Sequence, residues 1–217
     1  MTWERARKPE QKAVRRVEIL SAARALFSEL EYDEISLNGI AREAGFSKPN
    51  VYRYFSTREE IFLAIFREEQ DRFVESLIKR LKRIRSEEPV DSIARSWVKT
   101  ALEHSVWLDL LPQLSLSMER NSSVPQLVEF KKVVFERLND LVKTFHQVYP
   151  AIDIGGWSEI AQCGYSMMAG LWPHSNPGEN VIEAMKHPEV DQPLWDFEKI
   201  MVSGLKSLIL GMANRKS

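Results

Sequence analysis

Residues 36–55 read SLNGIAREAGFSKPNVYRYF, and this stretch predicts the fold of the N-terminal part of the chain. Ser36 has the side chain of a helix N-cap, and the small and apolar residues after it share one face of a short helix over about 37–44. Gly45 is a helix stop, because glycine readily adopts the left-handed conformation that is common just past a helix end.

A second short helix is predicted over about 48–54. Ser47 precedes it as a cap, and Pro49 lies in its first turn, where a missing N–H costs nothing. Two short helices joined by a three-residue turn that contains glycine form a helix-turn-helix.

The flanking residues predict two longer helices. Over about 13–30, apolar residues recur at spacings of three and four, which is typical of one helix face: Val17, Leu20, Ala23, Phe27 and Leu30. Ser56 and Glu59 match a capping box that opens a connecting helix over about 58–85. Its apolar stripe is Ile61, Ile65, Phe73, Leu77, Leu81 and Ile84.

Residues 1–12 are basic and lack periodicity, so we expect a flexible arm there.

The rest of the chain is also expected to be helical. Periodic segments lie at about 91–108, 109–119, 124–148, 154–172 and 192–214, and a long polar stretch separates the last two. Only nine glycines occur and strand-like alternation is scarce. We therefore predict an all-α fold of about nine helices, with an N-terminal helix-turn-helix domain over 1–58 and a larger C-terminal helical domain over 59–217.

Composition limits the class of protein. The 217 residues are 44% hydrophobic, which is normal for a globular chain. A single cysteine, Cys163, excludes an intramolecular disulfide framework and fits a reducing compartment. No stretch approaches the roughly 20 apolar residues that a membrane span needs, and the polar N-terminus has no signal-peptide pattern. We expect a cytoplasmic protein.

The outer positions of the helix-turn-helix fit DNA. Residues 1–58 carry 11 Lys/Arg against 8 Asp/Glu, a net charge of +3 in a chain of net charge −1. Lys48 can donate to guanine acceptors and Asn50 can pair with adenine. Tyr52, Tyr54 and Arg58 carry donors suited to phosphate oxygens.

The run from Ile19 to Phe66 resembles the TetR (TetR/AcrR) family of bacterial transcriptional regulators. The resemblance rests on ILSAARALFSE, then SLNGIAREAGFSKPNVYRYF, then STREEIFLAIF, about a quarter of the chain. It implies that Asn38, Lys48 and Asn50 read base edges and that further residues lie near phosphates. The full predicted DNA-binding set is Ser36, Leu37, Asn38, Ser47, Lys48, Pro49, Asn50, Tyr52, Arg53, Tyr54 and Arg58.

Two of these residues depart from the family pattern. Leu37 stands where a phosphate-binding hydroxyl is common, and Pro49 replaces the more usual glycine. The tyrosines could also pack against neighbouring helices, and Lys48 and Arg58 could be ordinary solvated charges.

The resemblance also implies a homodimer that pairs its last two long helices across a two-fold axis. The interface residues predicted there are Trp157, Ile160, Gly164, Met168, Gly204, Leu205, Leu208 and Met212. The alternative is that these helices close an intramolecular core.

The middle helices are rich in aromatic residues and methionine, which line apolar ligand pockets in many proteins and form plain cores in more. The residues predicted for a pocket that takes a small hydrophobic or aromatic ligand are Trp97, His104, Trp107, Met118, Phe130, Gln162, Cys163, Met167 and Trp172. Four scattered histidines and the absence of catalytic motifs argue against a metal site, a cofactor and an enzyme.

These patterns predict a ligand-responsive regulator, a repressor by resemblance, that binds a palindromic DNA operator as a homodimer. Two alternatives stay open. One is a DNA-binding regulator without a small-molecule ligand, and the other is a helical protein-binding module that has lost DNA binding.

Overall fold

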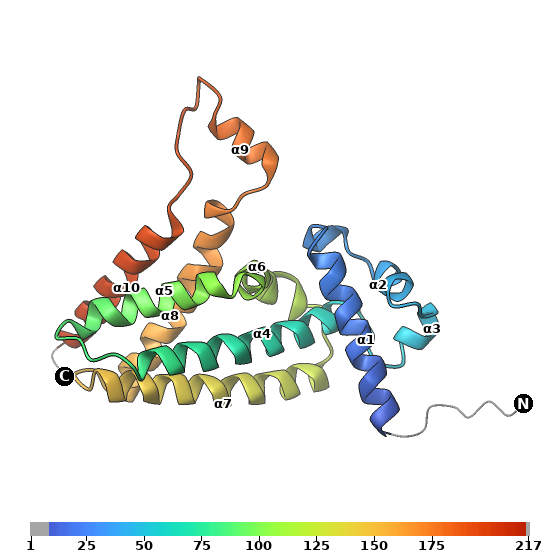
Figure 1. Cartoon of the computed structure of the whole chain (residues 1–217), viewed down its shortest axis with the longest axis horizontal. Coiled ribbons are helices and arrows are strands. Elements are labelled where there is room, and N and C mark those ends of the chain that lie inside the picture. The colour runs from blue at the N-terminus through green and yellow to red at the C-terminus, as the bar shows by residue number, and fades with distance from the viewer. Residues whose placement is uncertain (1–8, 216–217) are drawn as a thin grey trace, which may run out of the picture. The chain divides into compact units, whose positions relative to one another are not determined.

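The computed structural model describes residues 9–215, and within them every regular element is a helix (Figure 1). Ten α-helices are joined by loops, one 3-10 turn and one π-helical turn. The all-α prediction is confirmed, with one α-helix more than the nine expected. The chain divides into two compact units, which we call unit 1 and unit 2.

Unit 1 comprises the chain up to Glu68 together with Leu114–Phe130. Phe62 packs against the rings of Phe27 and Tyr32, with centroids 5.6 and 4.9 Å away. These aromatic contacts join the first helix, the following loop and the connecting helix into one core. Its elements are α1 (Pro9–Phe27), η1 (Tyr32–Glu34), α2 (Leu37–Glu43), α3 (Lys48–Val51), η2 (Leu114–Met118) and the first parts of α4 (Arg58–Leu81) and α7 (Val124–Val148).

The first helix differs from its prediction in range and in face. It begins at Pro9 and ends at Phe27, so residues 9–12 of the expected arm are helical, and residues 1–8 lie outside the described range. Val17 is 60% exposed and Leu30 is 41% exposed, although both were placed on the inner face. The buried residues are Ile19, Leu20, Ala22 and Ala23. Leu20 and Ala23 of the predicted stripe are confirmed as buried, and Ile19 and Ala22 join them in place of Val17 and Leu30.

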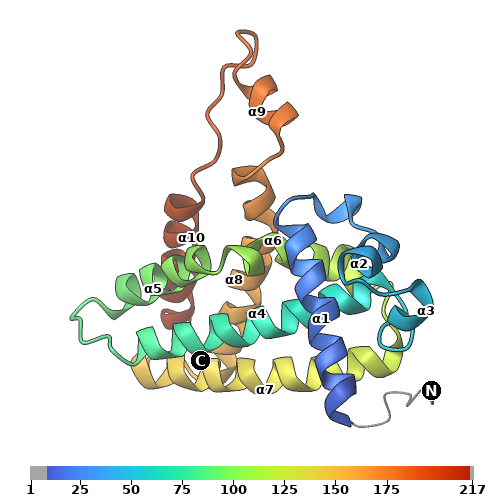
Figure 2. The ribbon, with the colours of Figure 1, turned by 45° about the vertical axis from the view of Figure 1, so that its right-hand side comes forward.

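Unit 2 comprises Glu69–Gln113 and residues 131–217, of which the structure describes those up to 215. It holds the remainders of α4 and α7 with α5 (Pro89–Glu103), α6 (Ser105–Gln113), α8 (Ile154–Ser175), α9 (Glu179–Met185) and α10 (Phe197–Ala213). Helix α10 packs against α5 and α8, and α8 also packs against α6. Figure 2 shows α8 and α10 side by side.

Stacked aromatic rings fill the core of unit 2. Trp107 lies parallel to Phe73 with a centroid distance of 4.0 Å, and Phe145 stacks on Trp157 at 4.8 Å. Trp97 leans on Phe145 at 5.0 Å. At Gly164 an added Cβ would lie 3.0 Å from Trp97 and from Leu205, so glycine lets α8 approach its neighbours closely.

Several helix boundaries in unit 2 differ from the sequence expectations. Helix α4 ends at Leu81 instead of about 85, and the break between α5 and α6 falls at His104 instead of 108. The stretch expected to be polar loop contains α9.

Within residues 9–215, no helix combines the length and apolarity needed to cross a membrane.

Candidate nucleic-acid interface

The helix-turn-helix is held by a cap, a glycine turn and a buried anchor. The Oγ of Ser36 accepts a hydrogen bond of 3.0 Å from the N–H of Gly39, as expected for the N-cap of α2. Gly45 has φ +68°, a left-handed conformation that side chains disfavour. Val51 of α3 and Phe55, which follows the helix, are buried and hold this segment against the rest of unit 1.

Arginines of α1 lie over the aromatic rings of this segment. The guanidinium of Arg16 lies 4.3 Å from the ring centroid of Phe55, and that of Arg15 lies 4.9 Å from the ring centroid of Phe46. Burial lowers the pKa of Arg16 from its usual value, with nearby Arg67 acting in the same direction. Cation–π contacts therefore hold two cations of α1, a helix outside the motif, against the motif's aromatic rings.

The outer side of the motif is polar and open to solvent. Ser36, Asn38, Ser47, Lys48, Pro49, Asn50 and Arg53 are exposed, Tyr52 is 48% exposed, and Leu37 and Tyr54 are half-buried. Ser47 occupies the N-cap position of α3, but its side chain makes no capping hydrogen bond. The Nζ of Lys48 lies 5.8 Å from the ring centroid of Tyr52. Most of the side chains predicted to contact bases or phosphates are therefore accessible to solvent.

Arg58 differs from the other predicted phosphate contacts. Its side chain is only 19% exposed, and Nη1 donates to the carbonyl oxygens of Tyr32 and Ile35 at 3.0 and 2.8 Å. Nη2 lies 3.0 Å from the carboxylate of Glu59, and the guanidinium stacks on Tyr32. The α1–α2 loop and Glu59 thus already bind the donors of Arg58, and its contact with phosphate stays a prediction.

The capping box at the start of α4 lies one residue later than predicted. The N–H of Glu60 donates to Thr57 Oγ1 at 3.2 Å, and the Glu60 carboxylate accepts from the N–H of Ser56 at 2.7 Å. The sequence STREE fits both registers, and the observed register buries Glu60, which also accepts from Ser123 Oγ at 3.0 Å.

Two family matches cover almost the whole described chain. Residues 19–65 match the bacterial regulatory proteins of the tetR family, and residues 67–216 match the tetracyclin repressor-like C-terminal domain. The chain belongs to the TetR family. It is therefore a DNA-binding transcriptional regulator, with the helix-turn-helix of the family in α2 and α3.

Similar proteins include regulators and solved structures of this family. The fatty acid metabolism regulator protein of Bacillus subtilis (strain 168) is 25% identical over 146 residues, which cover 66% of this chain and 68% of that protein. The fatty acid degradation regulator FadR from Bacillus halodurans has a TM-score of 0.54 and 16% identity, over 98% of this chain and all of the other. RolR in complex with resorcinol has a TM-score of 0.57 and 14% identity, over 96% and 97% of the two chains. At these identities the two structures show a shared fold.

The residues predicted for a ligand pocket do not form one lining in this TetR-family chain. Trp97 and Trp107 are buried in the ring stack of unit 2, whereas Met118 and Phe130 are buried in unit 1. Gln162 and Cys163 are exposed on α8, and the half-buried residues are His104, Met167 and Trp172. A periodic sequence pattern does not reveal which aromatic side chains pack on each other.

Several polar side-chain groups nevertheless lie among these aromatic rings. Trp107 Nε1 donates to Gln70 at 2.5 Å, and His104 Nε2 lies 3.1 Å from Ser76 Oγ. Burial lowers the pKa of His104 below its usual value. Trp97 Nε1 is buried without a hydrogen-bond partner.

The predicted dimer residues divide by burial. Trp157, Ile160, Gly164, Met168 and Leu205 are buried within the chain, and Gly204, Leu208 and Met212 are half-buried. These five residues pack inside unit 2 of the same chain, and their contact with a second copy stays a prediction. Many exposed residues of these helices are small or polar, among them Gln162, Cys163, Ser166 and Gly170 on α8 and Ser207 and Gly211 on α10. Ile200 and Leu210 on α10 are large apolar residues that are also exposed.

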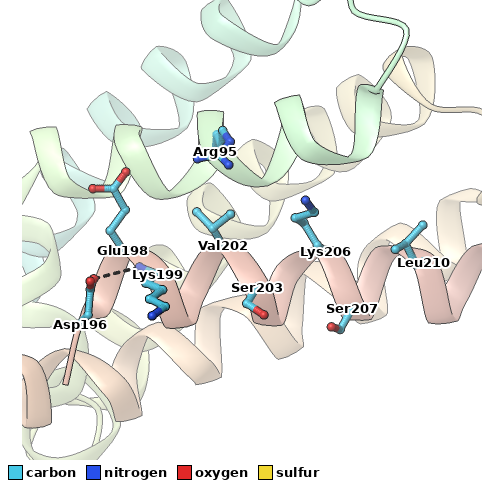
Figure 3. Close-up of a pocket in the computed structure, with 9 residues that line it drawn as sticks. All are labelled: Arg95, Asp196, Glu198, Lys199, Val202, Ser203, Lys206, Ser207 and Leu210. Atoms are coloured by element: carbon cyan, nitrogen blue, oxygen red, sulfur yellow. Dashed lines mark hydrogen bonds between the residues drawn. The ribbon is translucent and has the colours of Figure 1, made fainter.

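A pocket of about 540 Å³ lies along α10 (Figure 3). Arg95 contributes to it from α5, and its other lining residues are Asp196, Glu198, Lys199, Val202, Ser203, Lys206, Ser207 and Leu210. Arg95 and Lys206 both bind the carboxylate of Asp91 at 2.6 Å. None of the predicted ligand residues lines this pocket.

Among the described residues, no group of three or more His, Cys, Asp or Glu could hold a metal ion.

Proposed function

We propose that this chain is a ligand-responsive repressor that binds a palindromic operator as a homodimer and is released by a small hydrophobic or aromatic ligand. The observation that carries the DNA-binding part is the solvent-facing set on α3. Lys48 and Asn50 are exposed there, while Val51 of the same helix and Phe55, which follows it, are buried. A fastened helix with free donors is suited to a major groove.

The dimer follows from the size of this motif. One short α3 presents few base contacts, so specificity needs two half-sites about 34–36 Å apart, or a multiple of that distance. We place the interface on the exposed side of α8 and α10, where Ser166, Gly170, Ser207 and Gly211 would let two copies approach closely.

The ligand class is inferred from unit 2 and from similar proteins. The unsatisfied Trp97 Nε1 offers a donor among the aromatic rings of unit 2, which suits an aromatic or acyl molecule that carries an acceptor. Names of similar proteins refer to fatty acid metabolism and to resorcinol. Because the rings of unit 2 stack on one another, a ligand must displace them and thereby favour another conformer.

The test is fluorescence anisotropy on DNA from upstream of the chain's own gene, across a salt series. We expect binding that exceeds that of scrambled DNA, weakens steeply with salt and saturates at one or more whole dimers per site. Lys48→Ala and Asn50→Ala should each weaken binding by about tenfold or more, whereas Lys132→Ala, an exposed lysine on α7, should not.

Two outcomes would contradict the proposal. Equal affinity for every DNA, with no effect of Lys48→Ala or Asn50→Ala, would favour the protein-binding module. Specific binding that no fatty acid, acyl thioester or phenolic compound releases would favour a regulator without a small-molecule ligand.

A further inference from the structure

The positive charge of the N-terminal part of the chain is concentrated before the helix-turn-helix. Residues 1–16 carry six Lys/Arg against two Asp/Glu, a net charge of +4, whereas residues 17–58 carry five against six, a net charge of −1. Proteins draw their sequence-independent affinity for DNA from cations that neutralise phosphates. The residues that include the helix-turn-helix contribute no net positive charge to this affinity.

The start of α1 places two of these cations in solvent. Lys12 and Arg15 are both exposed, and the side chain of Arg15 is 49% exposed. They lie three residues apart within α1, so they are neighbours on one face of the helix. Two adjacent cations on a helix surface are suited to an extended anion such as a nucleic-acid backbone.

Arg15 lies next to the beginning of α3. Its guanidinium is 4.9 Å from the ring centroid of Phe46, and Phe46 directly precedes Ser47, the N-cap of α3. Figures 1 and 2 both show α3 beside α1. The N-terminal residues of a recognition helix contact base edges in the major groove. A cation at this end of α3 therefore lies at the rim of the groove, where the phosphates are.

The neighbours of Arg15 leave it able to bind a phosphate. Nη1 donates to the carboxylate of Glu18 at 3.1 Å, and a guanidinium has five N–H donors in all. Arg15 and Glu18 are 49% and 45% exposed, and an ion pair that is so open to solvent is worth little. A phosphate oxygen can therefore join or replace Glu18 at small cost.

Arg16, the next residue, serves the interior of unit 1 instead. Its guanidinium lies 4.3 Å from the centroid of the buried ring of Phe55, and it lines a small pocket together with Glu60 and Glu129. These carboxylates oppose its positive charge. Arg16 is therefore a contrast to the two exposed cations on the same turns of α1.

We propose that Lys12 and Arg15 bind DNA phosphates at the edge of the major groove that receives α3, as a second DNA contact outside the helix-turn-helix. This inference rests on the proposed placement of α3 in that groove. The contact supplies affinity and fixes the position of the motif on the duplex, and it reads no bases.

The experiment measures how Lys12→Gln/Arg15→Gln binds DNA from upstream of the chain's own gene across a salt series. A dimer would lose four phosphate contacts, so the slope of log affinity against log salt should become shallower by about 3.5. Affinity should fall at least tenfold, and by the same factor for scrambled DNA, because phosphates carry no sequence information. Both side chains are exposed, so folding should be preserved, as circular dichroism would verify.

Single variants separate a phosphate contact from a structural role. Arg15→Lys keeps the charge and should retain most of the salt slope. Lys12→Gln leaves the contact between Arg15 and Phe46 in place and should by itself produce about half of the change in slope. The control for lost charge is Lys132→Gln/Lys143→Gln, on two exposed lysines of α7, which should leave affinity and slope unchanged.

The outcomes distinguish this inference from the proposed function. Equal affinity of the wild type for every DNA, with no effect of Lys48→Ala, would overturn the placement of α3 and the α1 contact together. A loss of affinity in Lys48→Ala, with unchanged affinity and slope in Lys12→Gln/Arg15→Gln, would overturn the α1 contact alone. A double variant that loses its preference for the upstream DNA at an unchanged slope would also overturn it, because Arg15 would then act by positioning α3.

Discussion

Arg58 joins the loop between α1 and α2 to the start of α4. Its guanidinium binds the carbonyl oxygens of Tyr32 and Ile35 and pairs with Glu59. Arg58 therefore holds the loop before α2 against the start of α4, whereas Lys48 and Arg53 are exposed to solvent.

Replacing Arg58 by alanine should mainly lower stability. Two largely buried carbonyl oxygens would lose charged donors, and we expect the free energy of unfolding to fall by about 2 kcal/mol. Urea denaturation measures this loss, and Arg53→Ala, on an exposed residue, should change stability by less than about 0.5 kcal/mol. Unchanged stability together with a large loss of DNA affinity would instead return Arg58 to the phosphate-binding set.

His104 predicts a pH dependence of stability. Burial lowers its pKa in the folded state, so below the usual value of 6.5 the unfolded state binds more protons than the folded state. The contribution of His104 is therefore present above pH 6.5 and is lost as the pH falls toward the folded pKa. Thermal unfolding of wild type and His104→Gln between pH 5 and 8 should show a smaller acid loss in the variant. Identical pH profiles would contradict this assignment.

At the level of elements, the start of α4 is fixed by one buried acid. Glu60 caps the helix together with Thr57 and also accepts from Ser123, which precedes α7. A single carboxylate thus ties two helix starts within unit 1.

The observed register of this capping box distinguishes two neighbouring hydroxyls. Thr57→Ala removes the acceptor for the Glu60 N–H and should cost about 1 kcal/mol of stability. Ser56→Ala, one residue earlier, should cost much less, because Ser56 takes part through its backbone N–H. Chemical denaturation of the two variants is the measurement, and the reverse order would support the Ser56–Glu59 register.

At the level of the whole molecule, DNA binding and dimerisation should be linked. The exposed side of α8 carries Ser166 among small residues, and a long charged side chain there would separate two closely packed copies. Ser166→Arg should therefore produce monomers and reduce operator affinity at least tenfold, and should not disturb the core because this residue is exposed.

Light scattering and anisotropy on the same samples test this linkage. Asn139→Arg, an exposed position on α7, is the matched control and should remain dimeric. Monomers that bind the operator as tightly as wild type would refute the need for a dimer.

The sequence by itself determined the helical class and the location of the DNA-binding motif. Helical periodicity, Ser36 and Gly45 are local features, and the structure places a helix cap and a left-handed turn at these two positions. Local spacing was sufficient because caps and turns depend on residues only a few positions apart.

The tertiary structure decided which side of each helix is buried and which donors remain free. The residues next to Arg58 in the sequence do not indicate that its guanidinium donates hydrogen bonds to the carbonyl oxygens of residues 32 and 35. Likewise, Trp157 and Leu205 are residue types that are common in protein interfaces, but in this chain they fill the core of unit 2. Burial is set by contacts between residues far apart in the chain, and periodicity along one helix cannot tell a partner helix of the same chain from one of a second copy.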